Sequence, residues 1–111
     1  MTEEMREFET GAYRSSDENK LDFEACLSPL VLKAYAEYIR KHRKTQKGDR
    51  ADDNWQKGMT KDSYMKGGFR HFMDWWLEHR GHEGRDGIID GLCGLMFNVQ
   101  GYLYELLKET K

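Results

Sequence analysis

Residues 60–80 read TKDSYMKGGFRHFMDWWLEHR and form the most regular segment of the chain. Thr60 is expected to cap a helix here, because a threonine oxygen can accept from a free amide of the first turn. The helix should end near Arg80-Gly81, since glycine tolerates the left-handed position after a helix. Apolar residues recur at helical spacing and are predicted to form its buried face: Met65, Phe69, Phe72, Met73 and Trp76.

Two further helices flank this segment. Ser28-Pro29 predicts the start of a first helix, which should run to about Lys44. A third helix is predicted from near Asp86 to about Lys108, with apolar residues on a broad face: Ile88, Ile89, Leu92, Met96, Val99, Leu103 and Leu106. The turn at residues 81–86 is short, so the last two helices should pack antiparallel.

The remaining segments are polar, and no alternating pattern predicts a strand. Residues 45–59 are expected to be a loop, and residues 1–27 an irregular arm preceding a helical domain at 28–111. The predicted fold is therefore all-α: a small bundle of three main helices. A bundle of this size buries a modest core, so we expect a homo-oligomer, either a dimer or a tetramer, to complete it.

Composition restricts the class of protein. Charged residues make up 34% of the chain and mean hydropathy is −0.93, yet three Trp, six Tyr and five Phe can supply a core. No apolar run could span a membrane, and the acidic start at residues 1–4 does not read as a signal peptide. Cys26 and Cys93 are expected to be buried free thiols rather than a disulfide. These features favour a cytoplasmic protein.

Carboxylates form the strongest functional pattern. Asp74 and Glu78 share one helix face, and Asp86 and Asp90 share another at the start of the next helix. Antiparallel packing would bring both pairs to the same end of the bundle, where a hard cation such as Mg²⁺ could offset their repulsion. Glu37 on the first helix could add a fifth carboxylate. The alternative is that Asp86 caps its helix and that Asp74 and Glu78 are solvated or pair with Arg70, Arg80 or Lys66.

Other polar residues remain open to two interpretations. His71 could contact substrate, or could be a packed and hydrogen-bonded residue. Asn98 could hydrogen-bond within the core, or could contact the edge of a base. A basic run at residues 40–50 could attract phosphates or could form a solvated helix end. Duplex nucleic acid is not an expected partner, because no second basic stripe or recognition motif accompanies the run.

Several of these residues also resemble a phage family. The resemblance spans about residues 9–107 and rests on Glu9-Thr10-Gly11-Ala12-x-Arg14, Lys20, the Ser28-Pro29 helix start, Asn54-Trp55-x-Lys57-Gly58, Arg70-His71 and Asp74-Trp75-Trp76. The chain resembles the dATP/dGTP diphosphohydrolase N-terminal-domain family, which is related to MazG-like all-α nucleotide pyrophosphohydrolases. Those enzymes usually carry Glu-x-x-Glu and Glu-x-x-Asp pairs, whereas the helix acids here are four residues apart.

The resemblance implies an Mg²⁺-dependent enzyme that splits a purine nucleoside triphosphate into monophosphate and pyrophosphate. It places the catalytic ligands at Glu37, Glu78 and Asp90, supported by Asp74 and Asp86. It places the nucleotide near Asn54, Trp55, Lys57, Arg70 and His71, with Arg14 and Lys20 closing over the phosphates. Two other hypotheses stay open: a nucleotide-binding or sequestering phage protein without turnover, and a helical module that binds a protein partner.

Overall fold

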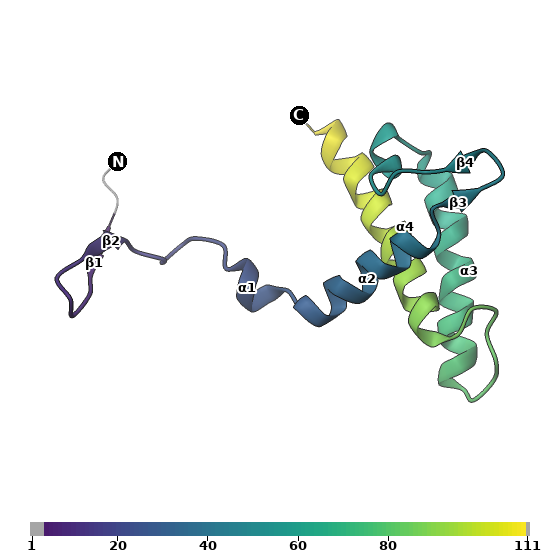
Figure 1. Ribbon diagram of the computed structural model, residues 1–111, viewed down its shortest axis with the longest axis horizontal. Helices are drawn as coiled ribbons and strands as arrows, with labels where there is room; N and C mark the ends of the chain where they lie inside the picture. Colours follow the sequence, from purple (N-terminus) through teal and green to yellow (C-terminus); the bar gives the residue numbers. More distant parts are fainter. Residues whose placement is uncertain (1–3, 111) are drawn as a thin grey trace.

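The computed structural model describes residues 4–110 and is mostly helical (Figure 1). In chain order it contains β1 (Met5–Glu7), β2 (Tyr13–Ser15), α1 (Phe23–Cys26), α2 (Pro29–Lys41), β3 (Lys44–Thr45), β4 (Gly48–Asp49), the 3₁₀ helix η1 (Asn54–Lys57), α3 (Lys61–His79) and α4 (Ile88–Glu109). The three predicted main helices are present. The all-α prediction needs correction, because β1 pairs with β2 and β3 with β4 in two short antiparallel hairpins.

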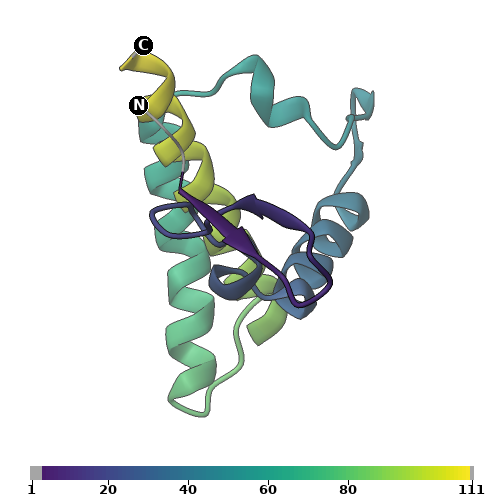
Figure 2. The ribbon, with the colours of Figure 1, turned by 90° about the vertical axis from the view of Figure 1, so that its left-hand side faces the viewer.

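The α3–α4 hairpin is the packed centre of the molecule, and its two helices run antiparallel side by side as predicted (Figure 2). Thr60 caps α3 by accepting from the amide of Ser63 at 3.2 Å. A stripe of small residues on α4 lets the helices approach closely. The facing pairs are Tyr64 over Gly101, Gly67 over Asn98, His71 over Gly94, and Asp74 over Gly91.

This glycine stripe overturns the predicted buried face of α3. The residues of α3 that are buried are Tyr64, Gly67 and Asp74. The predicted apolar face is instead at least 38% exposed at every position, and much of the apolar face of α4 is exposed with it. The physical reason is that glycines, rather than large apolar residues, bring the two helices together. The apolar side chains are therefore left on the flank of the contact.

The α2 helix crosses α4 and precedes the β3–β4 hairpin. Ser28 caps α2 by accepting from the amide of Val31, and Pro29 occupies its first turn, as predicted. The helix ends at Lys41 rather than near Lys44. The chain reverses there because the amide of Arg50 donates to the Arg43 carbonyl at 2.7 Å and the Arg50 guanidinium donates to the His42 carbonyl.

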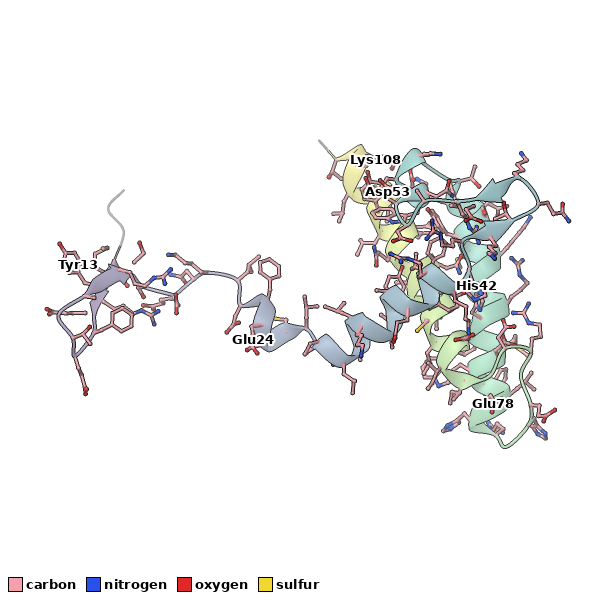
Figure 3. The ribbon with its side chains drawn as sticks, in the orientation of Figure 1. Tyr13, Glu24, His42, Asp53, Glu78 and Lys108 are labelled. Atoms are coloured by element: carbon pink, nitrogen blue, oxygen red, sulfur yellow. The ribbon has the colours of Figure 1, made fainter. Side chains whose placement is uncertain are left out.

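The arm at the start of the described chain extends away from the packed helices (Figure 1). It carries the β1–β2 hairpin and the single turn of α1, so it is less irregular than predicted. Figure 3 shows Tyr13 and Glu24 on this arm, well separated from Glu78 at the far end of α3. The acidic start at residues 1–3 lies outside the described residues.

The two cysteines differ in environment. Cys93 is buried in α4 as predicted, whereas Cys26 at the end of α1 is exposed, which corrects the prediction of two buried thiols. Cys26 is exposed because the arm that carries it has no packed layer beneath it. Among residues 4–110, no helix combines the length and the apolar character needed to cross a membrane.

Candidate metal centre

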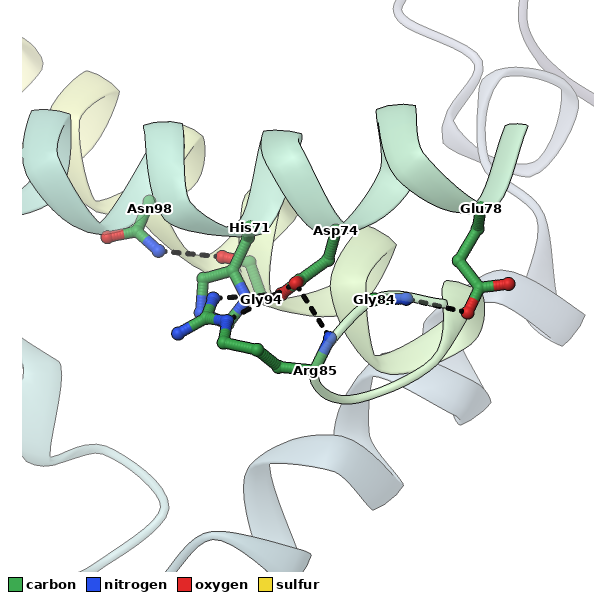
Figure 4. A network of polar contacts seen from close by, with 7 residues as sticks. All are labelled: His71, Asp74, Glu78, Gly84, Arg85, Gly94 and Asn98. Carbon is green, nitrogen blue, oxygen red and sulfur yellow. Dashed lines mark hydrogen bonds and ion pairs between the residues drawn. The ribbon is translucent and has the colours of Figure 1, made fainter. Parts of the chain in front are cut away.

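Asp74 is the most unusual residue of α3, because its carboxylate is only 2% exposed and lies where α3 meets the turn before α4. Arg85 in that turn clamps it: Nη2 donates to Oδ2 at 2.8 Å, while Nε and the backbone amide donate to Oδ1 at 3.2 and 3.0 Å (Figure 4). These hydrogen bonds lower the pKa of Asp74 despite its burial. Asp74 is therefore a buried anion held by one arginine.

His71 lies one turn before Asp74 and faces the same point. Its Nδ1 is 3.9 Å from Oδ2 of Asp74. This nitrogen atom is buried and has no hydrogen-bond partner among the described residues. Burial, reinforced by the charge of Arg85, lowers the pKa of His71. The imidazole is consequently neutral at pH 7, the state in which a histidine can bind a metal ion.

Asp86 completes a group of three possible metal ligands. Ligand atoms of His71, Asp74 and Asp86 all lie within 4.8 Å of one another, so these three residues could hold a metal ion. Asp86 is exposed and does not cap α4, whose N-cap is Gly87. Two ligands on opposite sides of a Mg²⁺ ion are about 4 Å apart, so a spacing of up to 4.8 Å is close to what one ion requires.

The ligand atoms of the group fit a cation even though the Asp74 carboxylate already accepts hydrogen bonds from Arg85. A carboxylate has about four lone-pair directions, and Arg85 uses two on Oδ1 and one on Oδ2. Oδ2, which faces the unpartnered Nδ1 of His71, thus keeps one direction open. Glycines make this geometry possible, since a Cβ at Gly94 would overlap the His71 ring and one at Gly91 would crowd Asp74.

Three carboxylates that were predicted as catalytic ligands lie outside this group of three residues. Glu78 accepts from the amide of Gly84 at 3.1 Å and so closes the α3–α4 turn (Figure 4). Asp90 forms an ion pair with Lys41, which ties α4 to the end of α2. Glu37 is exposed on α2 and is not part of the three-residue group. The predicted meeting of acids at one end of the hairpin thus holds for Asp74 and Asp86.

A small cavity of about 120 Å³ opens between α2, the β3–β4 hairpin and η1. Asn54 and Trp55, both predicted near the nucleotide, line it together with Arg43 and Arg50 from the basic run. Trp55 also meets the ring of Tyr104 edge-on at 4.8 Å, so α4 supports it. The Nε of Arg43 is buried without a hydrogen-bond partner in the described chain. The cavity therefore combines an aromatic ring with cationic and amide donors and with one acid, Asp52, which pairs with Arg40.

Tyr38 connects this cavity with the metal-capable group. It lines the cavity, and its pKa is raised mainly by burial and then by the charges of Asp86 and Asp90, while Arg50 opposes that rise. One tyrosine that lines the cavity is therefore influenced electrostatically by acids near the start of α4.

Other predicted substrate residues are not brought to this region. Arg14 lies on β2 and Lys20 in a turn of the arm, both far from α3 and α4 (Figure 1). Arg70 is exposed on α3, and Lys57 ends η1 without lining the cavity. The amide of Asn98 donates to the Gly94 carbonyl at 2.7 Å, which favours the core interpretation over base contact.

Sequence reasoning missed Arg85 and Tyr38. Arg85 directly precedes Asp86, and that adjacency of opposite charges was the available signal, but its choice of Asp74 depends on the shape of the turn. Tyr38 was not singled out, because a tyrosine on a helix carries no functional signal of its own. Comparison with family models, with curated proteins and with solved structures finds no match to this chain.

Proposed function

We propose that this chain is an Mg²⁺-dependent hydrolase that splits a purine nucleoside triphosphate into monophosphate and pyrophosphate. The observation that carries the proposal is the convergence of His71, Asp74 and Asp86 in a chain that also has a cavity lined by arginines and a tryptophan. The resemblance of the Asn54-Trp55 and Arg70-His71 segments to a diphosphohydrolase family agrees with this choice. Two carboxylates favour a hard cation that keeps bound waters for a phosphate substrate.

Each part of the region has a defined task in this proposal. A divalent cation bound there would activate a water and balance charge on the phosphates. His71 and Asp74 would be the two ligands held in fixed positions, because both lie on α3 and Arg85 holds the Asp74 carboxylate. Arg43 would donate to phosphate oxygens, together with the one guanidinium nitrogen of Arg50 that does not bind the His42 carbonyl. Trp55 offers a ring on which a base can stack.

The test is release of pyrophosphate from a panel of nucleoside triphosphates, with Mg²⁺ and with EDTA. Asp86→Asn removes the exposed carboxylate of the group, and the matched control Asp62→Asn changes an exposed carboxylate at the other end of α3. We expect EDTA to abolish release and Asp86→Asn to lower it by about tenfold to a hundredfold. The control should retain activity. Equal activity of Asp86→Asn and Asp62→Asn would contradict the proposal.

A second candidate function is nucleotide binding or sequestration without cleavage. The Asp74–Arg85 clamp favours it, because a guanidinium already neutralises the buried acid and no cation is required for that purpose. Calorimetric titration with dATP in EDTA separates the two functions. Binding without pyrophosphate release, weakened by Arg50→Gln, would support the second candidate. Neither binding nor release would favour the protein-interaction module instead.

A further inference from the structure

An apolar groove of about 610 Å³ runs along one flank of the α3–α4 hairpin, and none of its lining residues is charged. Met65 and Phe69 are 52% and 60% exposed there, and Val99 and Leu103 are 58% and 51% exposed. Exposed apolar surface of this extent, concentrated in one place, marks an interaction site in a water-soluble chain. Six of its eleven lining residues are ones that the sequence predicted to be buried: Met65, Phe69, Phe72, Val99, Leu103 and Leu106.

The two sides of the groove carry the same spacing. Met65, Phe69 and Phe72 follow one another at intervals of four and three on α3. Val99, Leu103 and Leu106 repeat those intervals on α4. Because α3 and α4 run antiparallel, a two-fold rotation can place one hairpin's groove on that of another copy. Two helix pairs packed in this way form a four-helix bundle with the apolar residues at its centre.

The surface area of one chain is far larger than that of a self-contained domain. The accessible area is 9439 Å², and the mass is 13.2 kDa. A folded monomer of that mass exposes about 6,400 Å², so the excess is about 3,000 Å². A standard interface covers about 800 Å² on each partner. The excess is therefore enough for a large, obligate type of interface.

The dimensions of the chain agree with its area. The radius of gyration is 19.5 Å, whereas a compact domain of this length has about 13 Å. Part of the excess belongs to the arm, where Leu21 and Phe23 are 83% and 66% exposed. Arm and groove are thus both uncovered in the same chain. A second copy is the one partner that offers a matching uncharged groove and a second large uncovered surface.

We propose that a second copy of this chain packs on the groove between α3 and α4, so that the two hairpins form a four-helix bundle. Sedimentation equilibrium is the first test. Wild type should have twice the mass of one chain, 13.2 kDa, or a higher even multiple. A single-chain mass at about 100 μM would overturn the proposal, because an obligate interface of this size associates well below that concentration.

Matched variants locate the contact. Met65→Glu and Leu103→Glu place a charge in the groove, whereas Met73→Glu and Leu107→Glu place one on the same helices outside its lining. Each groove residue has a control of similar exposure. Met65 is 52% exposed and Met73 is 44% exposed, while Leu103 is 51% exposed and Leu107 is 58% exposed. We expect the groove variants to sediment as single chains and the controls to remain associated. Association that survives both groove charges, with helical circular dichroism intact, would overturn the proposal.

A measurement on the wild type guards against variants that fail to fold. Methionine oxidation by hydrogen peroxide depends on exposure of the sulfur. In one chain Met65 is slightly more exposed than Met73, so a free chain should oxidise both at similar rates. The four-helix bundle predicts that Met65 is oxidised several-fold more slowly than Met73 in concentrated protein. Equal rates would overturn the proposal.

Discussion

At the scale of single residues, the Asp74–Arg85 clamp is the contact with the largest expected effect on stability. Arg85→Met should lower the free energy of unfolding by about 2 kcal/mol, less than the 3–5 kcal/mol typical of fully buried pairs. The smaller figure reflects the Arg85 side chain, which is 54% exposed and reached by water. Urea titration measures the change. Arg70 is an exposed arginine on α3, the helix that carries Asp74. The free energy of unfolding of Arg70→Met should stay within about 0.5 kcal/mol of wild type.

The same clamp predicts a dependence of stability on pH. Arg85 lowers the pKa of Asp74 in the folded chain below the value of about 4 usual for an unfolded aspartate. Its contribution is therefore complete above about pH 4, and it is lost as the pH falls through the lower folded pKa. Unfolding titrations in acid should show a steeper loss in wild type than in Asp74→Asn. If wild type and Asp74→Asn lose stability in parallel as the pH falls, the ionised carboxylate does not contribute to the free energy of unfolding.

Residue identity alone predicted part of the candidate site. Asp74 and Asp86 were predicted as metal ligands because carboxylates at helical spacing suit a hard cation. His71 was predicted only to contact substrate or to be a packed residue, so its place in the ligand group was missed. Arg85 could not be assigned, since its partner depends on a turn that bends the chain back over α3. Glu78 and Asp90 lie four residues after Asp74 and Asp86, a spacing that is expected to place them on the same helix faces. Glu78 instead accepts from the Gly84 amide, and Asp90 pairs with Lys41. Spacing places side chains on a face and leaves their partners undetermined.

At the scale of elements, the glycine stripe of α4 controls both packing and the site. Gly94→Ala should lower the free energy of unfolding by about 1–3 kcal/mol, because the new Cβ would overlap the His71 ring. Gly68→Ala is the matched control, since its Cβ would meet Asn98 at an ordinary 3.6 Å. That change should stabilise the chain by up to about 1 kcal/mol through helix propensity. Thermal and urea unfolding measure both, and equal effects would contradict the packing.

The elements themselves were predictable where local chemistry determines them. The caps at Ser28 and Thr60 follow from residue type and the next three positions. The hairpins β1–β2 and β3–β4 were missed, because strands of two or three residues show no alternating period. The end of α2 was misplaced for a related reason. Arg50 reverses the chain through the His42 carbonyl, a contact that helix periodicity does not encode.

At the scale of the whole molecule, the exposed apolar groove explains why the buried face was predicted wrongly. The pattern of Met65, Phe69 and Phe72 indicates burial, and one chain does not supply the covering layer. In the proposed four-helix bundle, a second copy supplies it. The pattern then describes the assembly rather than the isolated chain.

Association makes thermal stability depend on chain concentration. Dilution removes the partner that binds the folded state, so the thermal midpoint of wild type should fall as concentration falls. Differential scanning calorimetry over a hundredfold range of concentration measures it. Met65→Glu should melt at one temperature throughout that range, whereas Met73→Glu should follow wild type. A wild-type midpoint that stays constant would contradict an interface between copies.

His71, Asp74 and Asp86 could hold a metal ion, and we propose that they bind a divalent cation. The most direct test is titration of the protein with Mn²⁺ while the histidine resonances are followed by NMR, because this paramagnetic ion broadens nuclei close to it. The account predicts that the His71 signals disappear at lower Mn²⁺ than those of His79 and His82, and that Asp86→Asn raises the amount required. His71 signals that stay sharp until the other histidines broaden would contradict it.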